Sequence, residues 1–150
     1  MKPAPIVSLH EAVKRCRGWV MTSGGYDPIH PGHMSLMADA ADLGPLVVVV
    51  NGDAFLTVKK GRPFQDLATR CQIVSYVRGV AAVVPYEIAD DMTVNGALET
   101  LLPTCFVKGG DRDSAATIPE YETCRRLGIR VITGLGLPKR WSSSEMVAAR

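Results

Sequence analysis

Leu46-Val47-Val48-Val49-Val50 is an unbroken run of five apolar residues, four of them β-branched, and Gly44-Pro45 directly precedes it. A strand with one face in water alternates apolar and polar residues, whereas a strand covered on both faces stays apolar throughout, as in parallel sheets. The run therefore predicts an interior strand of a parallel sheet. The residues before it predict a helix, because apolar side chains recur at helical spacing at Met34, Met37, Ala38 and Ala41.

Strand-like and helix-like patterns alternate along the rest of the chain. Further strands are predicted at residues 19–22, 81–84, 105–107 and 129–132, with Gly24-Gly25 breaking the first and Pro85 ending the second. Helices are predicted at residues 9–15, 67–78, 93–101 and 119–127, and Ser8-Leu9-His10-Glu11 has the form of a capping box for the first. This alternation is typical of an α/β fold, so we predict a Rossmann-like open parallel sheet of about five strands with helices on both faces.

The composition bounds the class of protein. A length of 150 residues with 47% hydrophobic residues suits a single domain over 1–150, with residues 1–17 as an N-terminal helical segment. A formal charge of +2 does not indicate a nucleic-acid partner. No apolar run approaches the roughly 18 residues of a membrane span, and the start lacks a signal-peptide pattern, so we expect a soluble, cytoplasmic protein without a membrane partner. The cysteines form no Cys-x-x-Cys pair and are expected to be ordinary buried thiols: Cys16, Cys71, Cys105 and Cys124.

The segment after the first predicted strand combines glycines with two histidines. It reads Thr22-Ser23-Gly24-Gly25-Tyr26-Asp27-Pro28-Ile29-His30-Pro31-Gly32-His33. The glycines let the backbone turn sharply and approach a ligand closely. His30 and His33 lie three residues apart at the start of a helix, where their rings can face the same way and the free N–H groups favour an anion. These features predict a phosphate site, although neither the Walker nor the dinucleotide-binding glycine pattern is present.

Two plainer interpretations of the histidines stay open at this point. In the first, His30 caps the helix and His33 packs against the core. In the second, the pair binds a metal, but no third ligand follows at a useful spacing, so we expect no metal held by the protein. His10, on the first helix, is expected to be a surface residue.

The chain resembles the cytidylyltransferase-like nucleotidyltransferases in motifs that follow one another in the family's order. His30-Pro31-Gly32-His33 is similar to the His-x-Gly-His signature, and Val50-Asn51-Gly52-Asp53 is similar to the end of the family's second strand. Other similar segments are Lys59-Lys60-Gly61-Arg62-Pro63 with Arg70, Val107-Lys108-Gly109-Gly110-Asp111, and Ser142-Ser143-Ser144. The similarity runs from residue 19 to 147, and its nearest form is the adenylyltransferase domain of bifunctional heptose-phosphate kinase/adenylyltransferases.

The resemblance implies that a single nucleotidyltransferase domain transfers a nucleotidyl group from an NTP to a small phosphorylated substrate, with Mg²⁺ as cofactor and release of pyrophosphate. A phosphate oxygen is already anionic at pH 7, so such a reaction needs positioning and charge stabilisation rather than a general base. On this interpretation His30 and His33 bind the α- and β-phosphates. Lys60, expected in a loop beside Gly61, holds the accepting side, and the sequence leaves open whether Lys59 takes that role instead.

The other motif residues are expected to bind nucleotide or phosphate groups, and they are Ser23, Gly24, Gly25, Tyr26, Asp27, Gly32, Arg62, Arg70, Lys108, Gly109, Gly110, Asp111, Ser142, Ser143 and Ser144. Plainer alternatives exist for several of them. Arg62 and Arg70 could clamp phosphates through bidentate contacts or be solvated charges. Residues 108–111 could form an ordinary turn, and the serine run could cap the last helix. Asp27 could orient its loop or touch the substrate.

Two departures from the family bear on the substrate. Trp141 stands where a smaller residue is usual, and Lys139-Arg140-Trp141-Ser142 replaces the Arg-x-x-Gly-Ile-Ser-Thr of glycerol-phosphate cytidylyltransferases. The lack of that motif, together with the Lys108-Gly109-Gly110-Asp111 segment, favours ATP as the nucleotide and a sugar phosphate such as heptose 1-phosphate as acceptor. The alternatives are a cytidylyltransferase acting on glycerol 3-phosphate with CTP, and a non-catalytic nucleotide-binding module. The resemblance also leads us to expect a homodimer.

Overall fold

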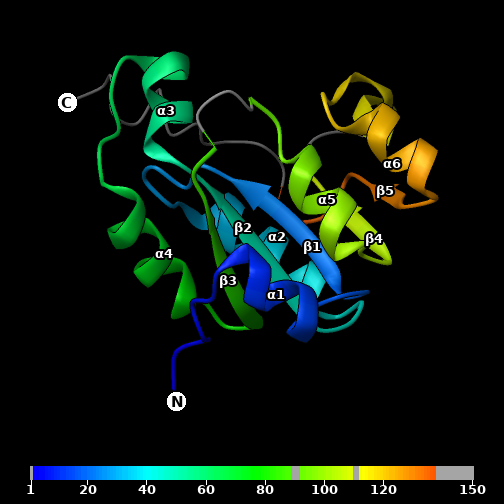
Figure 1. Cartoon of the computed structure of the whole chain (residues 1–150), viewed down its shortest axis with the longest axis horizontal. Coiled ribbons are helices and arrows are strands. Elements are labelled where there is room, and N and C mark those ends of the chain that lie inside the picture. Colours follow the sequence, from blue (N-terminus) through cyan, green and yellow to red (C-terminus); the bar gives the residue numbers. More distant parts are fainter. Residues whose placement is uncertain (1, 89–91, 110–111, 138–150) are drawn as a thin grey trace.

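The computed structural model describes residues 2–88, 92–109 and 112–137, and within them five parallel strands form one sheet in the order β3-β2-β1-β4-β5 (Figure 1). The strands are β1 (Val20–Gly24), β2 (Leu46–Asn51), β3 (Val80–Tyr86), β4 (Cys105–Val107) and β5 (Arg130–Ile132). The helices are α1 (Leu9–Arg15), α2 (Pro31–Ala41), α3 (Asp53–Lys60), α4 (Leu67–Ser75), α5 (Asn95–Leu101) and α6 (Tyr121–Leu127), with a 3₁₀ helix at Arg112–Thr117. The predicted α/β fold with a parallel sheet is confirmed.

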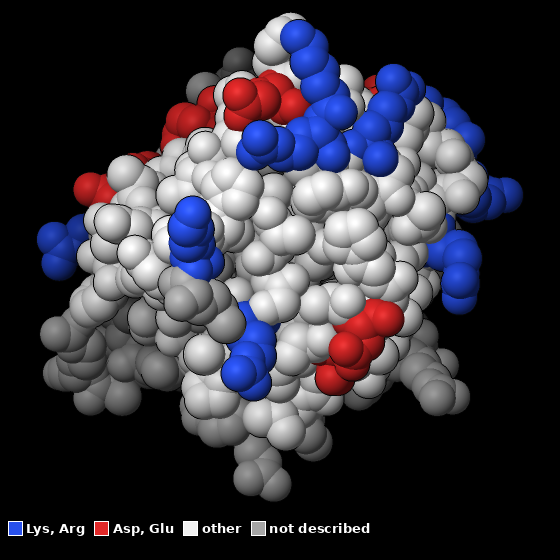
Figure 2. Space-filling view, turned by 90° about the horizontal axis from the view of Figure 1, so that it is seen from below, with Lys and Arg blue, Asp and Glu red and all other residues white. Residues whose placement is uncertain are grey.

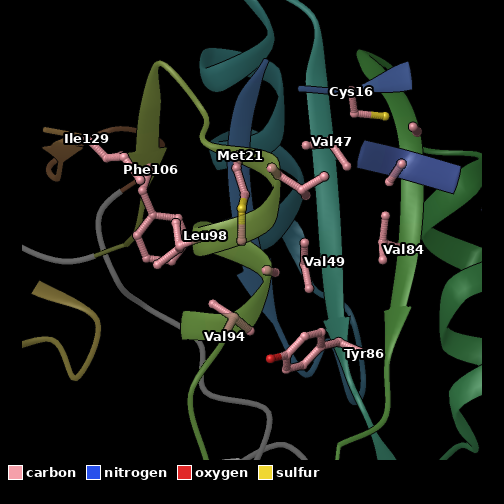
Figure 3. Close-up of a cluster of buried hydrophobic side chains, with 14 of the residues drawn as sticks. Cys16, Met21, Val47, Val49, Val84, Tyr86, Val94, Leu98, Phe106 and Ile129 are labelled. Carbon is pink, nitrogen blue, oxygen red and sulfur yellow. The ribbon is translucent and has the colours of Figure 1, made fainter. Parts of the chain in front are cut away.

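The apolar run at residues 46–50 is covered on both faces, as its composition predicts. Val47 and Val49 pack with α1, α5 and α6 on one face, whereas Leu46, Val48 and Val50 pack with α2 and α4 on the other. All five side chains are fully buried. Figure 3 shows the first of these two layers, in which the labelled side chains of Met21, Val47, Val49 and Phe106 lie between the strands and α5. Two apolar layers therefore hold the sheet rigidly enough to position loops at its ends.

The N-terminal segment extends the sheet at the β3 edge. Val7 N–H donates to the Val83 carbonyl at 2.9 Å, and Val83 N–H donates to the Pro5 carbonyl at 2.9 Å. The prediction that Pro85 ends the strand is wrong, since β3 continues to Tyr86 and Pro85 pairs with Val50. A proline fits there because β3 is the last strand of the five-stranded sheet, and an edge strand tolerates a residue without an N–H donor.

Helix α3 is the largest departure from the predicted elements, because Lys59 and Lys60 end a helix instead of lying in a loop. Gly52 at its N-cap has no side chain with which to cap it. The cap comes instead from Glu87, whose carboxylate accepts hydrogen bonds from the N–H groups of Asp53 (2.7 Å) and Ala54 (3.1 Å). Gly61 ends the helix at a positive φ of 90°, a conformation that glycine adopts without steric cost.

The described surface carries mixed charge. On the face shown in Figure 2, several Lys and Arg side chains gather along the upper edge beside Asp and Glu, whereas most of the remaining described surface of that face is uncharged. In the described ranges, no helix has both the length and the apolar character that crossing a membrane requires.

Candidate active site

The site lies where the strand order reverses. Strand β1 pairs with β2 on one side and with β4 on the other, and in open α/β sheets ligands bind outside the carboxyl ends of the strands at such a point. Contacts between side chains and backbone join the two strands there. Thr22 Oγ1 donates to the Val107 carbonyl at 2.6 Å, and Lys108 Nζ donates to the Ser23 carbonyl at 2.9 Å. The segment after β1 and the segment after β4 therefore meet at one place.

The two histidines cap the start of α2 reciprocally. His33 N–H donates to His30 Nδ1 at 3.4 Å, and His30 N–H donates to His33 Nδ1 at 3.3 Å. The two histidine rings stack with centroids 3.6 Å apart, and the Tyr26 and His33 rings form a T-shaped pair with centroids 5.0 Å apart. The capping interpretation and the phosphate interpretation are therefore compatible, because the cap engages Nδ1 of each ring, whereas phosphate binding would use Nε2.

Both rings are set to act as neutral hydrogen-bond donors. An Nδ1 that accepts a backbone hydrogen bond requires the tautomer protonated on Nε2, so the network assigns the proton of each neutral ring to Nε2. Burial is the largest cause that lowers the pKa of His33 and, together with the charges of His30, Lys108 and Lys60, it brings the pKa to about 3. The pKa of His30 is also lowered, mainly by burial. Near neutral pH the pair supplies N–H dipoles rather than positive charge.

Two lysines supply the positive charge. Lys60 Nζ donates to the backbone carbonyl oxygen of Asp27 and lies 3.4 Å from Oδ2 of the Asp27 side chain. The end of α3 therefore contacts the segment that leads to the histidines. Burial is the main cause that lowers the pKa of Lys108, which is half-buried beside Ser23. Lys59 is exposed, with Nζ 5.7 Å from the centroid of the Phe55 ring. The geometry favours Lys60 over Lys59 as the inner lysine.

Gly24 and Gly25 serve packing more than backbone freedom. Neither has a positive φ, so the backbone conformation at these two positions does not itself require glycine. A Cβ at Gly24 would lie 3.0 Å from the Tyr26 ring, and a Cβ at Gly25 would lie 2.8 Å from Leu56 Cδ2. Tyr26 itself has a φ of 52° and is buried. The two glycines thus allow the Tyr26 ring and α3 to approach the end of β1 closely.

Asp27 is buried and orients its surroundings. Its Oδ2 accepts from Phe64 N–H at 2.6 Å, and its Oδ1 accepts from Gln65 N–H at 2.8 Å. Together with the Lys60 ammonium these donors engage both carboxylate oxygens, and the side chain is 1% exposed. Of the two roles considered for Asp27, the contacts favour orientation of the loop.

The remaining predicted residues differ in placement. Arg62 is exposed on the segment after α3, whereas Arg70 is fully buried on α4 and hydrogen-bonded within the protein. Gly32 lies in the first turn of α2, where its carbonyl accepts from Ser35 Oγ at 3.0 Å, and Gly109 is exposed after β4. The predicted residues outside the described ranges are Gly110, Asp111, Ser142, Ser143 and Ser144.

Two acidic residues and one hydroxyl near the site carry no sequence motif of their own. Asp39 Oδ2 accepts from Gly136 N–H at 2.7 Å, and Ser35 Oγ accepts from Leu137 N–H at 2.8 Å, so α2 also holds the segment after β5. The buried Glu120 accepts from Val94 N–H at 3.2 Å, and its charge partly offsets the lowering of the Lys108 pKa. Their partners lie 26 to 102 residues away in sequence, so local spacing gave no signal for them.

The described residues do not form a metal site of their own. Among them, no group of three or more His, Cys, Asp and Glu side chains is placed to hold a metal ion. The carboxylate of Asp27 is engaged by Lys60 and backbone N–H groups, and the carboxylate of Asp53 is paired with Arg70 at 2.7 Å.

The sheet order, the paired histidines at the switch point and the adjacent lysines form an arrangement that suits a protein of the cytidylyltransferase-like class. The cytidylyltransferase-like family profile matches residues 21–144, and the chain belongs to this family. Among its relatives, the bifunctional protein HldE of Nitrosococcus oceani is 41% identical over 95 residues, which are 61% of this chain and 20% of that protein. HldE of Actinobacillus pleuropneumoniae is 38% identical over 107 residues, which are 69% of this chain and 22% of that protein. The chain thus spans about a fifth of the length of these curated relatives.

Solved structures share the fold. The lipopolysaccharide core biosynthesis protein of Thermoplasma volcanium superposes with a TM-score of 0.63 at 24% identity, covering 79% of this chain and 97% of that chain. Pantothenate synthetase from Thermus thermophilus superposes with a TM-score of 0.66 at 15% identity, covering 95% of this chain and 67% of that one. At these identities the likeness concerns the fold alone.

Proposed function

We propose that this chain transfers the nucleotidyl group of ATP to a sugar phosphate such as heptose 1-phosphate, giving an NDP-sugar and pyrophosphate. The observation that carries the proposal is the reciprocally capped pair His30 and His33, flanked by Lys60 and Lys108 at the β1–β4 switch point. Cations and neutral N–H donors gathered at one edge of a sheet suit a triphosphate. The similarity to HldE proteins supports a place in sugar-nucleotide synthesis.

In the proposed reaction, an acceptor phosphate oxygen attacks the α-phosphorus while the bond from that phosphorus to the oxygen bridging to the β-phosphate breaks. Pyrophosphate leaves with the bonding electron pair, and no proton needs to be removed from the acceptor. His30 and His33 donate through Nε2 to the α- and β-phosphate oxygens as charge develops on them. Lys60 holds the acceptor phosphate, with Arg62 at the rim, and Lys108 neutralises charge on the nucleotide side.

The proposal also covers the metal ion that accompanies the nucleotide and the cellular compartment of the protein. We expect Mg²⁺ to enter on the nucleotide phosphates, since the ion usually combines substrate phosphates with few protein ligands. The backbone around Ser23 to Gly25, Gly109 to Asp111 and the serines at 142–144 would complete the nucleotide side. An NTP-consuming enzyme needs the cytoplasmic nucleotide pool, and the buried thiols of all four cysteines are unpaired, as is usual in a reducing compartment. We also propose that the chain forms a homodimer and has no nucleic-acid or membrane partner.

A pyrophosphate-release assay tests the proposal. ATP, CTP, GTP and UTP are each combined with heptose 1-phosphate, hexose 1-phosphates and glycerol 3-phosphate at saturating Mg²⁺. We expect ATP to exceed CTP by at least ~10-fold in kcat/KM with a sugar 1-phosphate, because one unpaired hydrogen-bonding group in a base pocket costs about 1–3 kcal/mol. A preference for CTP with glycerol 3-phosphate would mean that CTP is the nucleotide and glycerol 3-phosphate the acceptor, in place of ATP and a sugar phosphate. Absence of turnover with every pair, in protein that binds NTP, would favour the non-catalytic nucleotide-binding module.

A further inference from the structure

Arg70 has the largest fully buried side chain among the described residues, with an exposed fraction of 0%. Its guanidinium makes four hydrogen bonds, which reach three separate stretches of the chain, at residue 25, at residues 51–53 and at residue 65. They run from Nε to the Gln65 carbonyl (2.9 Å), from Nη1 to the carbonyls of Gly25 (2.9 Å) and Asn51 (2.6 Å), and from Nη2 to Asp53 Oδ1 (2.7 Å). One side chain thus joins the segment after β1, the end of β2, the start of α3 and the approach to α4.

These contacts leave Arg70 little capacity to bind a phosphate. A guanidinium has five N–H groups, and a bidentate contact with an anion needs two parallel ones. Four hydrogen bonds already engage the group, and its positive charge is paired with the Asp53 carboxylate. The arrangement therefore suits a side chain that holds other parts of the site, and it does not suit the phosphate clamp that the motif suggests.

Asp27 reinforces the same connection from the opposite side. Its carboxylate accepts from the N–H groups of Phe64 and Gln65, while Arg70 Nε donates to the Gln65 carbonyl. The segment at residues 61–65, which follows Lys60 and carries Arg62, is therefore tied to residues 25–27 by two buried charges of opposite sign. Residues 25–27 lead directly to His30.

We propose that Arg70 is a positioning residue that fixes the spacing between the histidine-bearing segment and the end of α3, and that it acts on catalysis without touching substrate. The expected effect of Arg70 on turnover rests on the proposed function, whereas its connection of the chain segments does not. Alignment of reacting groups is worth large factors in rate, so a loosened connection should lower turnover more than it weakens binding of either substrate.

The kinetic test compares Arg70→Met with two controls. For Arg70→Met we expect kcat to fall by about tenfold or more, with KM for nucleotide and acceptor within about threefold of the wild type. Arg70→Lys, which keeps a charge for Asp53 but not the fork, should recover only part of kcat. Arg62→Met, an exposed arginine on the same segment, should raise KM instead. Val74→Ala, a buried change one turn further along α4, should lower stability while leaving kcat unchanged below its melting temperature.

Amide hydrogen exchange at Phe64 and Gln65 supplies a readout that needs no catalysis. Exchange should accelerate by about tenfold or more in Arg70→Met and stay at the wild-type rate in Arg62→Met and Val74→Ala. If Arg70→Met does not fold, Asp53→Ala removes one of the four contacts and should shift exchange and kcat in the same direction by smaller factors. Wild-type exchange at both amides, or a rise in KM with unchanged kcat, would overturn the proposal. If no substrate pair is turned over, the proposed function fails while the exchange rates still decide whether Arg70 connects the segments.

Discussion

His33 combines a structural and a chemical duty in one ring. Its Nδ1 accepts the His30 N–H, and its Nε2 carries the proton that we assign to phosphate binding. His33→Ala should lower kcat by roughly two to four decades, the range for losing a preorganised donor to a developing charge. NTP affinity should weaken far less, because the N–H groups of the first turn of α2 remain. Steady-state kinetics with direct NTP titration checks this, and turnover within threefold of wild type would remove His33 from the mechanism.

The lowered pKa of His33 has a consequence for stability in acid. The unfolded ring takes up a proton near its ordinary pKa of 6.5, whereas the folded ring does so only near 3. Between these values the unfolded state binds more protons, so the free energy of unfolding should fall as the pH drops from 6.5 towards 3. His33→Gln should show a smaller drop in melting temperature between pH 7 and pH 5 than the wild type does. His10→Gln, at an exposed histidine, is the matched control and should follow the wild type.

At the scale of elements, α3 depends on a cap that lies 34 residues from its first residue. Glu87→Ala should lower the free energy of unfolding by about 1 kcal/mol, the usual loss for an N-cap, and should shorten α3 from its N-terminal end. Glu87→Gln keeps one acceptor oxygen and should lose less. Denaturant titration measures both variants, with the exposed Glu122→Ala as a control expected within about 0.5 kcal/mol of wild type. Equal stability of Glu87→Ala and wild type would mean that water caps the helix as well as the carboxylate does.

The same helix illustrates which elements a sequence can predict. The run from Leu46 to Val50 predicts its strand directly, because burial on both faces requires an apolar residue at every position. Helix α3 gives no comparable signal, because Gly52 has no side chain that could cap it and the capping carboxylate of Glu87 lies far away in sequence. Predictions based on spacing succeed where the partner lies within a few residues, as for His30 and His33, whose reciprocal bonds span one turn.

Arg70 shows what a sequence motif cannot predict at the candidate site, namely the partners that a side chain contacts. Its motif indicates that it belongs near the site, but three of its four hydrogen-bond partners are the backbone carbonyls of residues 25, 51 and 65. Every residue type has a carbonyl, so no pattern of side chains can mark such partners in advance. The inner position of Lys60 relative to Lys59 also becomes apparent only once α3 sets the direction of each side chain.

At the scale of the whole molecule, residues 2–8 protect the β3 edge. The segment satisfies the N–H and C=O groups of Val83 and buries Val7, which is 5% exposed. Deletion of residues 2–7 should lower the melting temperature and promote association that increases with protein concentration, since an uncovered strand edge pairs with other chains. Differential scanning fluorimetry and light scattering over a range of concentrations check this. A truncated chain that melts and scatters like the full chain would show that the edge needs no cover.

The sheet order divides the chain into two continuous portions, one ending with β3 and the other beginning with α5, that adjoin along β1 and β4. His30, His33 and Lys60 belong to the first portion and Lys108 to the second, and the Thr22–Val107 and Lys108–Ser23 hydrogen bonds close this junction at the end where the candidate site lies. A gene cut between β3 and α5 would therefore encode two polypeptides whose reassociation rebuilds the site across their junction. If the proposed triphosphate binds there, it would link the two pieces, and assembly of the split protein would report the concentration of that nucleotide.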